Sequence, residues 1–136
     1  MTREQIMLVQ ASWDEIEPLS DKLGELFYRR LFTALPEARL LFTKSAREQG
    51  ELLMAMLGSM VRMLDAPQGM FVSLAEIGKR HREYGVKAEY YGPFKETLLW
   101  ALGMALGDAF SGQLEEAWEA MYDHLATLMQ PPGSAD

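Results

Sequence analysis

Histidine is the first residue type in this sequence that could do chemistry, because there is no cysteine and there are only two histidines, His81 and His124. On a helical wheel of residues 71–84, His81 falls in line with the apolar Leu74 and Ile77, while charged side chains take the outer side. We therefore expect His81 to point into the core and His124 to lie at the boundary of its helix's apolar face. An inward neutral imidazole is either a core histidine with hydrogen-bonded ring nitrogens or a metal ligand.

Two further polar side chains stand among apolar neighbours. Gln49 shares a helical stripe with Leu53 and Met56, and Tyr28 lies among the inward residues of a second helix. Each has an ordinary alternative, Gln49 as a first-turn surface residue and Tyr28 as a core aromatic with its hydroxyl at the rim. Together with an inward His81 they suit an apolar pocket in which the imidazole binds haem iron and polar groups lie opposite.

The remaining chemical signatures are missing from the sequence. Without cysteine, the chain can form no disulfide, thiolate zinc site or iron–sulfur cluster. It also has no Gly-rich phosphate loop, no G-x-S-x-G elbow and no H-E-x-x-H motif. The ten methionines recur at helical spacings, which favours core packing over a soft-metal or peptide-binding surface. Glu115, Glu116 and Glu119 have no histidine beside them and are interpreted as a solvated face.

Composition predicts one acidic domain. The 136 residues include 13 Lys and Arg against 20 Asp and Glu, a net charge of −7, and 49% are hydrophobic. This balance argues against nucleic-acid binding, which needs a basic face. No apolar run approaches the roughly 18 residues of a membrane span, and the N-terminus lacks a signal-peptide apolar region. We therefore expect a soluble, unprocessed, cytoplasmic protein without a membrane partner.

Apolar residues recur at three- and four-residue spacings almost throughout, which predicts an all-α fold. Thr2 and Gln5 form a capping-box pattern, Pro18 ends the first helix, and Ser20 is expected to cap the second. The second helix is expected to stop near Leu35. A short helix beginning at Pro36 is followed by predicted helices over 47–64, over a short segment ending at Gly85, and over 88–106 and 111–130, with a loop at 65–69. We expect one domain over residues 1–130 and a frayed tail over 131–136.

The order of several motifs carries a family resemblance. These are LFYRRLF at 26–32, PEARLLF at 36–42, EQ at 48–49 and IGKRHREYGV at 77–86, followed by Tyr91 and by Trp118 near Tyr122. In this order and spacing, the sequence resembles the single-domain bacterial haemoglobins of the globin family, including Vitreoscilla-type haemoglobin, hell's gate globin and the haem domain of flavohaemoglobins. The resemblance covers nearly the whole chain.

The resemblance implies a globin fold, a three-over-three helical sandwich around a pocket for haem b. It makes His81 the proximal iron ligand, Tyr28 and Gln49 the distal polar pair, and Leu53 the distal apolar gate. Phe42 would wedge the haem at an inter-helix corner. Val86 and Tyr91 complete the residues expected at the cofactor, Tyr91 as a partner of the proximal imidazole.

The implied function is reversible, high-affinity binding of dioxygen and of other diatomic ligands, carbon monoxide and nitric oxide. The alternatives are a nitric oxide dioxygenase and a structural or sensor globin in which His81 is a core residue; no residue is assigned as catalytic. Flavohaemoglobins place a glutamate late in the last helix, where this chain reads Gln130-Pro131-Pro132-Gly133. We therefore expect a more neutral proximal histidine, oriented by a backbone carbonyl, and a weakened O–O cleavage. With no flavin domain before Asp136, electrons would come from a separate reductase, and the protein is expected to be a monomer or homodimer.

Overall fold

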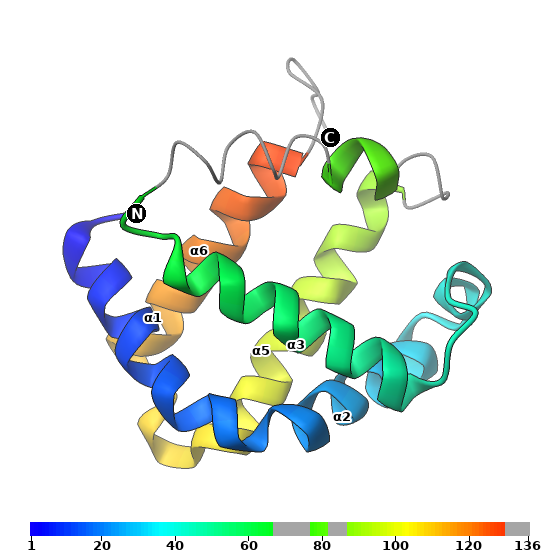
Figure 1. The fold of residues 1–136 in the computed structure, drawn as a ribbon, viewed down its shortest axis with the longest axis horizontal. Coiled ribbons are helices and arrows are strands. Elements are labelled where there is room, and N and C mark those ends of the chain that lie inside the picture. The colour runs from blue at the N-terminus through cyan, green and yellow to red at the C-terminus, as the bar shows by residue number, and fades with distance from the viewer. Residues whose placement is uncertain (67–76, 82–86, 130–136) are drawn as a thin grey trace.

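The computed structural model describes residues 1–66, 77–81 and 87–129, and these ranges contain helices and no strand (Figure 1). The all-α prediction is confirmed. The elements are α1 (Arg3–Ile16), η1 (Glu17–Leu19), α2 (Ser20–Ala34), η2 (Pro36–Leu41), α3 (Ala46–Arg62), the helical segment 77–81, η3 (Ala88–Tyr90), α5 (Tyr91–Leu106), η4 (Gly107–Ala109) and α6 (Gly112–Met129). The predicted helix end at Gly85 and the predicted tail 131–136 lie outside the described residues.

The first helix begins as its local sequence predicts, and the second does not. At α1, Thr2 accepts a hydrogen bond from the Gln5 backbone and the Gln5 side chain bonds back to the Thr2 backbone, so the capping box is confirmed. Ser20 is not a cap. It is the first residue of α2, with helical backbone angles, and its N–H donates to the Glu17 carbonyl. The 3-10 turn around Pro18 leads straight into α2, so Ser20 lacks the extended conformation that a capping residue needs.

Two other predicted boundaries change. The polar corner before α3 contains the true cap, Ser45, whose hydroxyl accepts a hydrogen bond from the Glu48 backbone at 3.2 Å. The predicted helix 88–106 divides into the 3-10 turn η3 and the α-helix α5, which starts at Tyr91. Pro93 is tolerated in α5 because it lies in the first turn, where the backbone N–H needs no helical partner.

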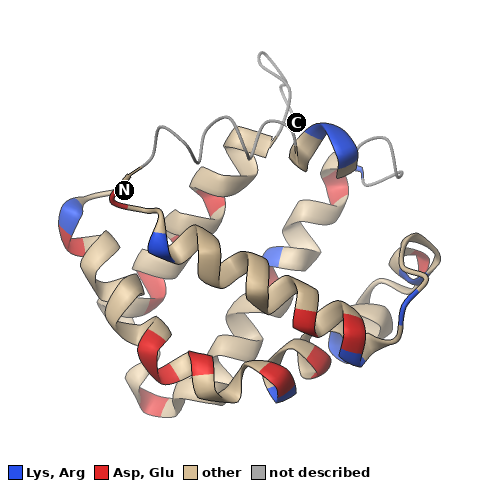
Figure 2. Cartoon of the chain, in the orientation of Figure 1, with Lys and Arg blue, Asp and Glu red and all other residues tan. Residues whose placement is uncertain are grey.

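The helices form the three-over-three arrangement that the resemblance implies. One layer contains α1, α3 and the segment 77–81, and the other contains α2, α5 and α6; between the layers, α1 crosses α6 and α2 crosses α3 (Figure 1). A buried polar link joins the first and last helices, because the Trp118 indole donates to the Ser12 hydroxyl at 2.9 Å and that hydroxyl donates to the Val9 carbonyl at 2.8 Å. Figure 2 shows that charge on α3 lies toward its two ends, which leaves its middle for apolar contacts.

Candidate functional site

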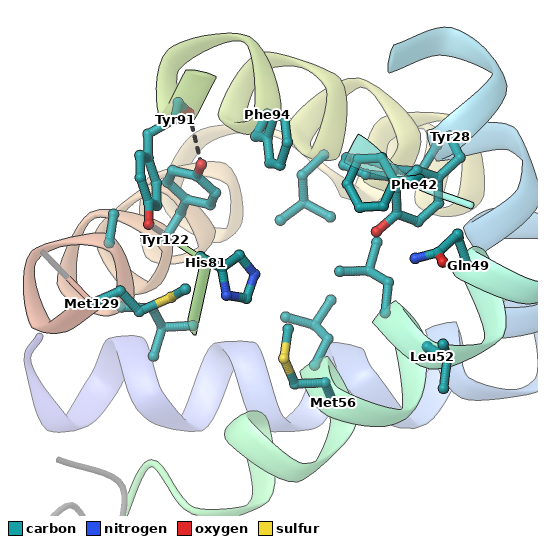
Figure 3. A pocket seen from close by; sticks show the side chains of 16 residues that line it. Tyr28, Phe42, Gln49, Leu52, Met56, His81, Tyr91, Phe94, Tyr122 and Met129 are labelled. Atoms are coloured by element: carbon teal, nitrogen blue, oxygen red, sulfur yellow. Dashed lines mark hydrogen bonds between the residues drawn. The ribbon is translucent and has the colours of Figure 1, made fainter. Parts of the chain in front are cut away.

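A cavity of about 270 Å³ lies between α3, α5, α6 and the segment 77–81 (Figure 3). Its lining is apolar and aromatic, with few polar groups, as in many small-molecule sites. The lining residues are Phe27, Tyr28, Phe42, Gln49, Leu52, Leu53, Met56, Leu57, His81, Tyr91, Phe94, Leu98, Tyr122, Leu125, Ala126 and Met129. The described site residues expected from the sequence therefore share one cavity. Val86 lies outside the described residues.

His81 presents one ring nitrogen to this cavity. Its Nδ1 lies 2.8 Å from the backbone carbonyl of Ile77, one turn earlier in the same helix. A carbonyl can only accept, so Nδ1 carries the ring proton and donates it, which leaves the Nε2 lone pair as the metal-binding position. Figure 3 shows the ring pointing into the cavity. If His81 were only a core histidine with both ring nitrogens hydrogen-bonded, a second group would have to donate a hydrogen bond to its Nε2.

The polar pair lies across the cavity from this ring. Tyr28 is only 6% exposed, and its hydroxyl forms a hydrogen bond with the Gln49 side chain. Figure 3 shows the two side chains next to each other. Burial raises the pKa of Tyr28 to about 12, and the Gln49 hydrogen bond opposes that rise. The Gln49 amide can donate a hydrogen bond to the phenol oxygen, and the phenol proton is then available to a third group in the cavity.

A glycine contact between α2 and α3 brings this pair together. A Cβ built on Gly24 would lie 2.5 Å from the Gly50 carbonyl oxygen, so any side chain there would collide with backbone. Gly24 lies one helical turn before Tyr28, and Gly50 follows Gln49 directly. The close crossing of two helix backbones thus sets the separation of the phenol and the amide. Nothing in the local sequence marks either glycine as part of the site.

Phe42 and Leu53 complete the distal wall. Phe42 follows η2 in extended backbone and packs its ring edgewise on Tyr28, with centroids 5.2 Å apart. Phe27 makes a second edge contact with Tyr28 at 4.9 Å, so the phenol ring is held on two sides. Leu53 follows Gln49 by one turn and lines the cavity beside it. Aromatic contacts of this kind fix the ring without using its hydroxyl.

Tyr91 and Tyr122 line the side nearer His81. The Tyr122 hydroxyl donates to the Tyr91 carbonyl at 2.6 Å, joining α6 to the first residue of α5 (Figure 3). Burial, followed by the Tyr91 hydroxyl and the Asp123 carboxylate, raises the pKa of Tyr122 well above its ordinary range. Tyr122 was noted in the sequence only as part of a family motif. Its hydrogen bond to a residue 31 positions away gives it a place in the site.

The segment that carries His81 is anchored by a second glycine. Gly78 is buried, and a Cβ there would overlap the backbone carbonyl of Met129 at the end of α6. The helix bearing His81 therefore lies directly against the C-terminal turn of α6. Like the contact between α2 and α3, this approach is possible only with glycine.

Comparison with known proteins agrees with this geometry. The sequence profile of the family described as Globin matches residues 25–129. The chain belongs to the globin family. Flavohemoproteins of Bordetella pertussis and Deinococcus radiodurans are 30% and 28% identical to this globin, over 90% and 95% of its length. The matches cover 31% and 33% of those proteins, so the chain spans about a third of their length.

Two solved structures are also similar to this globin. An engineered carbene transferase, itself a candidate nitric oxide dioxygenase from Rhodothermus marinus, superposes with a TM-score of 0.85 at 29% identity, over 95% of this chain and 90% of its own. A hexacoordinated haem protein from an anhydrobiotic tardigrade shares the fold, with a TM-score of 0.83 at 17% identity, over 95% of this chain and 92% of its own. The predicted globin fold is thereby confirmed.

The donor set of this globin fits haem better than a bare metal ion. Among residues 1–66, 77–81 and 87–129, no group of three or more His, Cys, Asp and Glu side chains could hold a metal. A lone imidazole suits an iron that brings its own macrocyclic nitrogen ligands, and the apolar cavity suits the macrocycle. Outside the cavity, His124 is half-buried on α6, as predicted, and does not line it. In the described part of the chain, no helix is long and apolar enough to cross a membrane.

Proposed function

We propose that this globin binds haem b through His81 and uses the opposite side of the cavity to bind dioxygen reversibly. The observation that carries the proposal is the His81 ring, whose Nδ1 is committed to the Ile77 carbonyl while Nε2 faces an apolar cavity that ends in a hydrogen-bonded tyrosine and glutamine. When bound, haem supplies a ferrous iron that accepts a diatomic ligand. The protein supplies the axial imidazole and the surroundings of that ligand.

Each polar residue then has a distinct task. The Ile77 carbonyl fixes the tautomer and orientation of His81. The Tyr28 hydroxyl, kept protonated by burial, donates to a ligand that carries negative charge, and Gln49 holds the phenol in place while offering its own amide. Hydrogen bonds to charged groups contribute about 1.5–3 kcal/mol, so these donors should stabilise bound dioxygen by more than they stabilise bound carbon monoxide, which carries less charge.

Phe42, Leu53 and Tyr91 have supporting roles in the proposal. Phe42 would wedge the macrocycle, Leu53 would gate the distal space, and Tyr91 would accompany the proximal imidazole; Val86 is proposed as a further cofactor contact. An amide coordinates iron poorly, so we propose that ligand-free iron is five-coordinate, water-bound or, when ferric, held by Tyr28. We also propose that residues 1–130 form one domain, and that the protein is cytoplasmic and a monomer or homodimer in solution.

Absorbance spectra of the purified protein test the proposal. After addition of hemin and reduction, we expect a Soret band and separate deoxy, oxy and carbonmonoxy spectra. His81→Ala should lose stable haem, and His124→Ala, which changes the other half-buried histidine, should retain it. Circular dichroism would show whether each variant folds. If folded His81→Ala holds haem with an unchanged spectrum, His81 is not the ligand.

A second function, nitric oxide dioxygenation to nitrate, is favoured by the relatives. The Bordetella pertussis and Deinococcus radiodurans relatives are flavohemoproteins, and the Rhodothermus marinus protein is a candidate nitric oxide dioxygenase. Such turnover requires a reductase to restore ferrous iron. Because almost any oxy-globin reacts with nitric oxide once, the test is sustained nitrate formation with an added flavin reductase and a nicotinamide donor. A single stoichiometric burst under those conditions would favour a carrier or scavenger.

A further inference from the structure

Two methionine thioethers face the cavity, Met56 from α3 and Met129 from α6. Met56 follows Gln49 by two helical turns and Leu53 by three residues, so it belongs to the same stripe of α3. Figure 3 shows the Met56 sulfur between the His81 ring and α3, whereas Met129 lies on the other side of that ring. Met56 is thus the thioether that borders the distal part of the cavity.

We propose that Met56 is a modification site, oxidised to the sulfoxide by hydrogen peroxide that reacts inside this cavity. The inference rests on the proposed haem function. In the overall step the peroxide O–O bond breaks, one oxygen atom bonds to the Met56 sulfur, and the other leaves as water with both protons. Sulfur is oxidised by two electrons and peroxide is reduced by two.

Oxidation at Met56 differs from the general oxidation of surface methionines in the residue that reacts first. Met7 and Met104 are 60% and 63% exposed, so peroxide in bulk water reaches them first. Met56 is half-buried and lines the cavity. A thioether held beside the place where peroxide is activated reacts as if its concentration were greatly raised. With haem bound, Met56 should therefore be oxidised before Met7 and Met104, the reverse of the order that their exposure predicts.

The neutral proximal ligand makes this oxidation slow and stoichiometric. The single Nδ1 proton of His81 is donated to a backbone carbonyl, which gives the ring little anionic character to promote O–O cleavage. Rapid peroxidase turnover is then not expected. The oxygen atom from peroxide that does react in the cavity is then transferred to a side chain of the cavity lining, once for each side chain oxidised.

Oxidation at Met56 would change the cavity. A sulfoxide converts a flexible apolar side chain into a polar one. The new oxygen would enter a cavity whose lining is mostly apolar and aromatic. Ligand or haem binding should weaken, and because methionine sulfoxide is enzymatically reducible, the change can be reversed. Met56 would thus link peroxide exposure to ligand binding at this site.

Peptide mass spectrometry of peroxide-treated protein tests the inference without measuring activity. Haem-loaded and haem-free protein are treated with the same low excess of hydrogen peroxide, and oxygen incorporation is followed separately at Met56, Met129, Met7 and Met104. In the haem-loaded protein we expect Met56 to be oxidised about tenfold faster than the two exposed methionines. In the haem-free protein, Met7 and Met104 should be oxidised first.

A conservative variant and a matched control complete the design. Met56→Leu keeps an apolar side chain of similar size, and after peroxide treatment its haem-loaded form should lose oxygen or haem more slowly than the parent protein, each compared with its own untreated sample. Met54→Leu changes a methionine that is 4% exposed and lines a different cavity beside Trp13, so it should behave as the parent does. Oxidation that follows exposure in both haem states, or that strikes Met129 first, refutes the inference while a normal Soret band upholds the proposed function. Absence of a Soret band refutes both.

Discussion

Removing one hydroxyl from the distal wall should isolate the energy of its hydrogen bond. In Tyr28→Phe the ring keeps its edge contacts with Phe27 and Phe42, at 4.9 and 5.2 Å, so the cavity keeps its shape. The phenol carries its proton throughout the neutral range, because burial holds its pKa near 12, and it is therefore a donor whenever a ligand is bound. The variant loses that donor and little else.

The expected magnitude follows from the charge on the ligand. A hydrogen bond to a charged group contributes about 1.5–3 kcal/mol, and about 1.4 kcal/mol corresponds to tenfold, so oxygen should dissociate roughly 10 to 100 times faster from Tyr28→Phe. Carbon monoxide dissociation should change much less. Stopped-flow displacement of oxygen by excess carbon monoxide measures the first rate, and displacement of carbon monoxide by nitric oxide measures the second.

A second buried tyrosine provides the control. Tyr90 is 5% exposed and lies outside the cavity, so Tyr90→Phe should leave both dissociation rates unchanged. Gln49→Leu should also speed oxygen loss, since it removes the amide and the bond that positions the phenol. An oxygen dissociation rate within about twofold of the parent in both Tyr28→Phe and Gln49→Leu would refute the donor argument, because such a change corresponds to only about 0.4 kcal/mol.

Three further changes test the scaffold around the cavity. Gly50→Ala forces a Cβ against the α2 backbone and should lower the free energy of unfolding, measured by urea denaturation, by about 1–3 kcal/mol. Gly92→Ala, with open space around it, should cause no such loss. Equal losses in the two variants would contradict the inference that α2 and α3 can cross this closely only with glycine. Ser12→Ala leaves the buried Trp118 indole N–H without its acceptor, so calorimetry should show a free energy of unfolding lower by about 1–3 kcal/mol. An unchanged free energy of unfolding would show that this hydrogen bond does not stabilise the fold. Raised phenol pKa values mean that the folded protein holds protons that the unfolded chain releases above about pH 10, so stability should fall as pH rises beyond that value. Tyr122→Phe should reduce this alkaline fall, and an unchanged pH dependence would show that Tyr122 does not cause it.

Structural features that depend only on residues close together in the sequence were predictable. The capping box of Thr2 and Gln5 depends on residues three apart, and it is present in the structure. The inward direction of His81 and the cavity-facing stripe that begins at Gln49 follow from helical periodicity, which is equally local. Ser20 shows the limit of such patterns, because its hydroxyl could cap a helix only if the preceding turn were extended rather than helical.

Features that depend on two distant backbones were not predictable. Gly24 and Gly50 look like ordinary helix-interior glycines until α2 and α3 are seen to cross there, and nothing in either segment identifies the other as its partner. The hydrogen bond from Tyr122 to the Tyr91 carbonyl likewise requires the start of α5 to lie against the interior of α6. The sequence could supply polar candidates for the pocket, but their separation is set by packing between helices.

The partner of His81 also bears on which function this globin performs. An imidazole carries one Nδ1 proton, and here it is donated to the Ile77 carbonyl. A carbonyl is a neutral acceptor, so it orients the ring without drawing the proton away as a carboxylate would. In the proposed haem complex the imidazole would therefore be a neutral axial ligand, which suits reversible ligand binding better than cleavage of an O–O bond. Both proposed functions would start from bound dioxygen rather than from peroxide. The proximal geometry therefore favours both proposed functions over a peroxidase, and the supply of electrons decides between them.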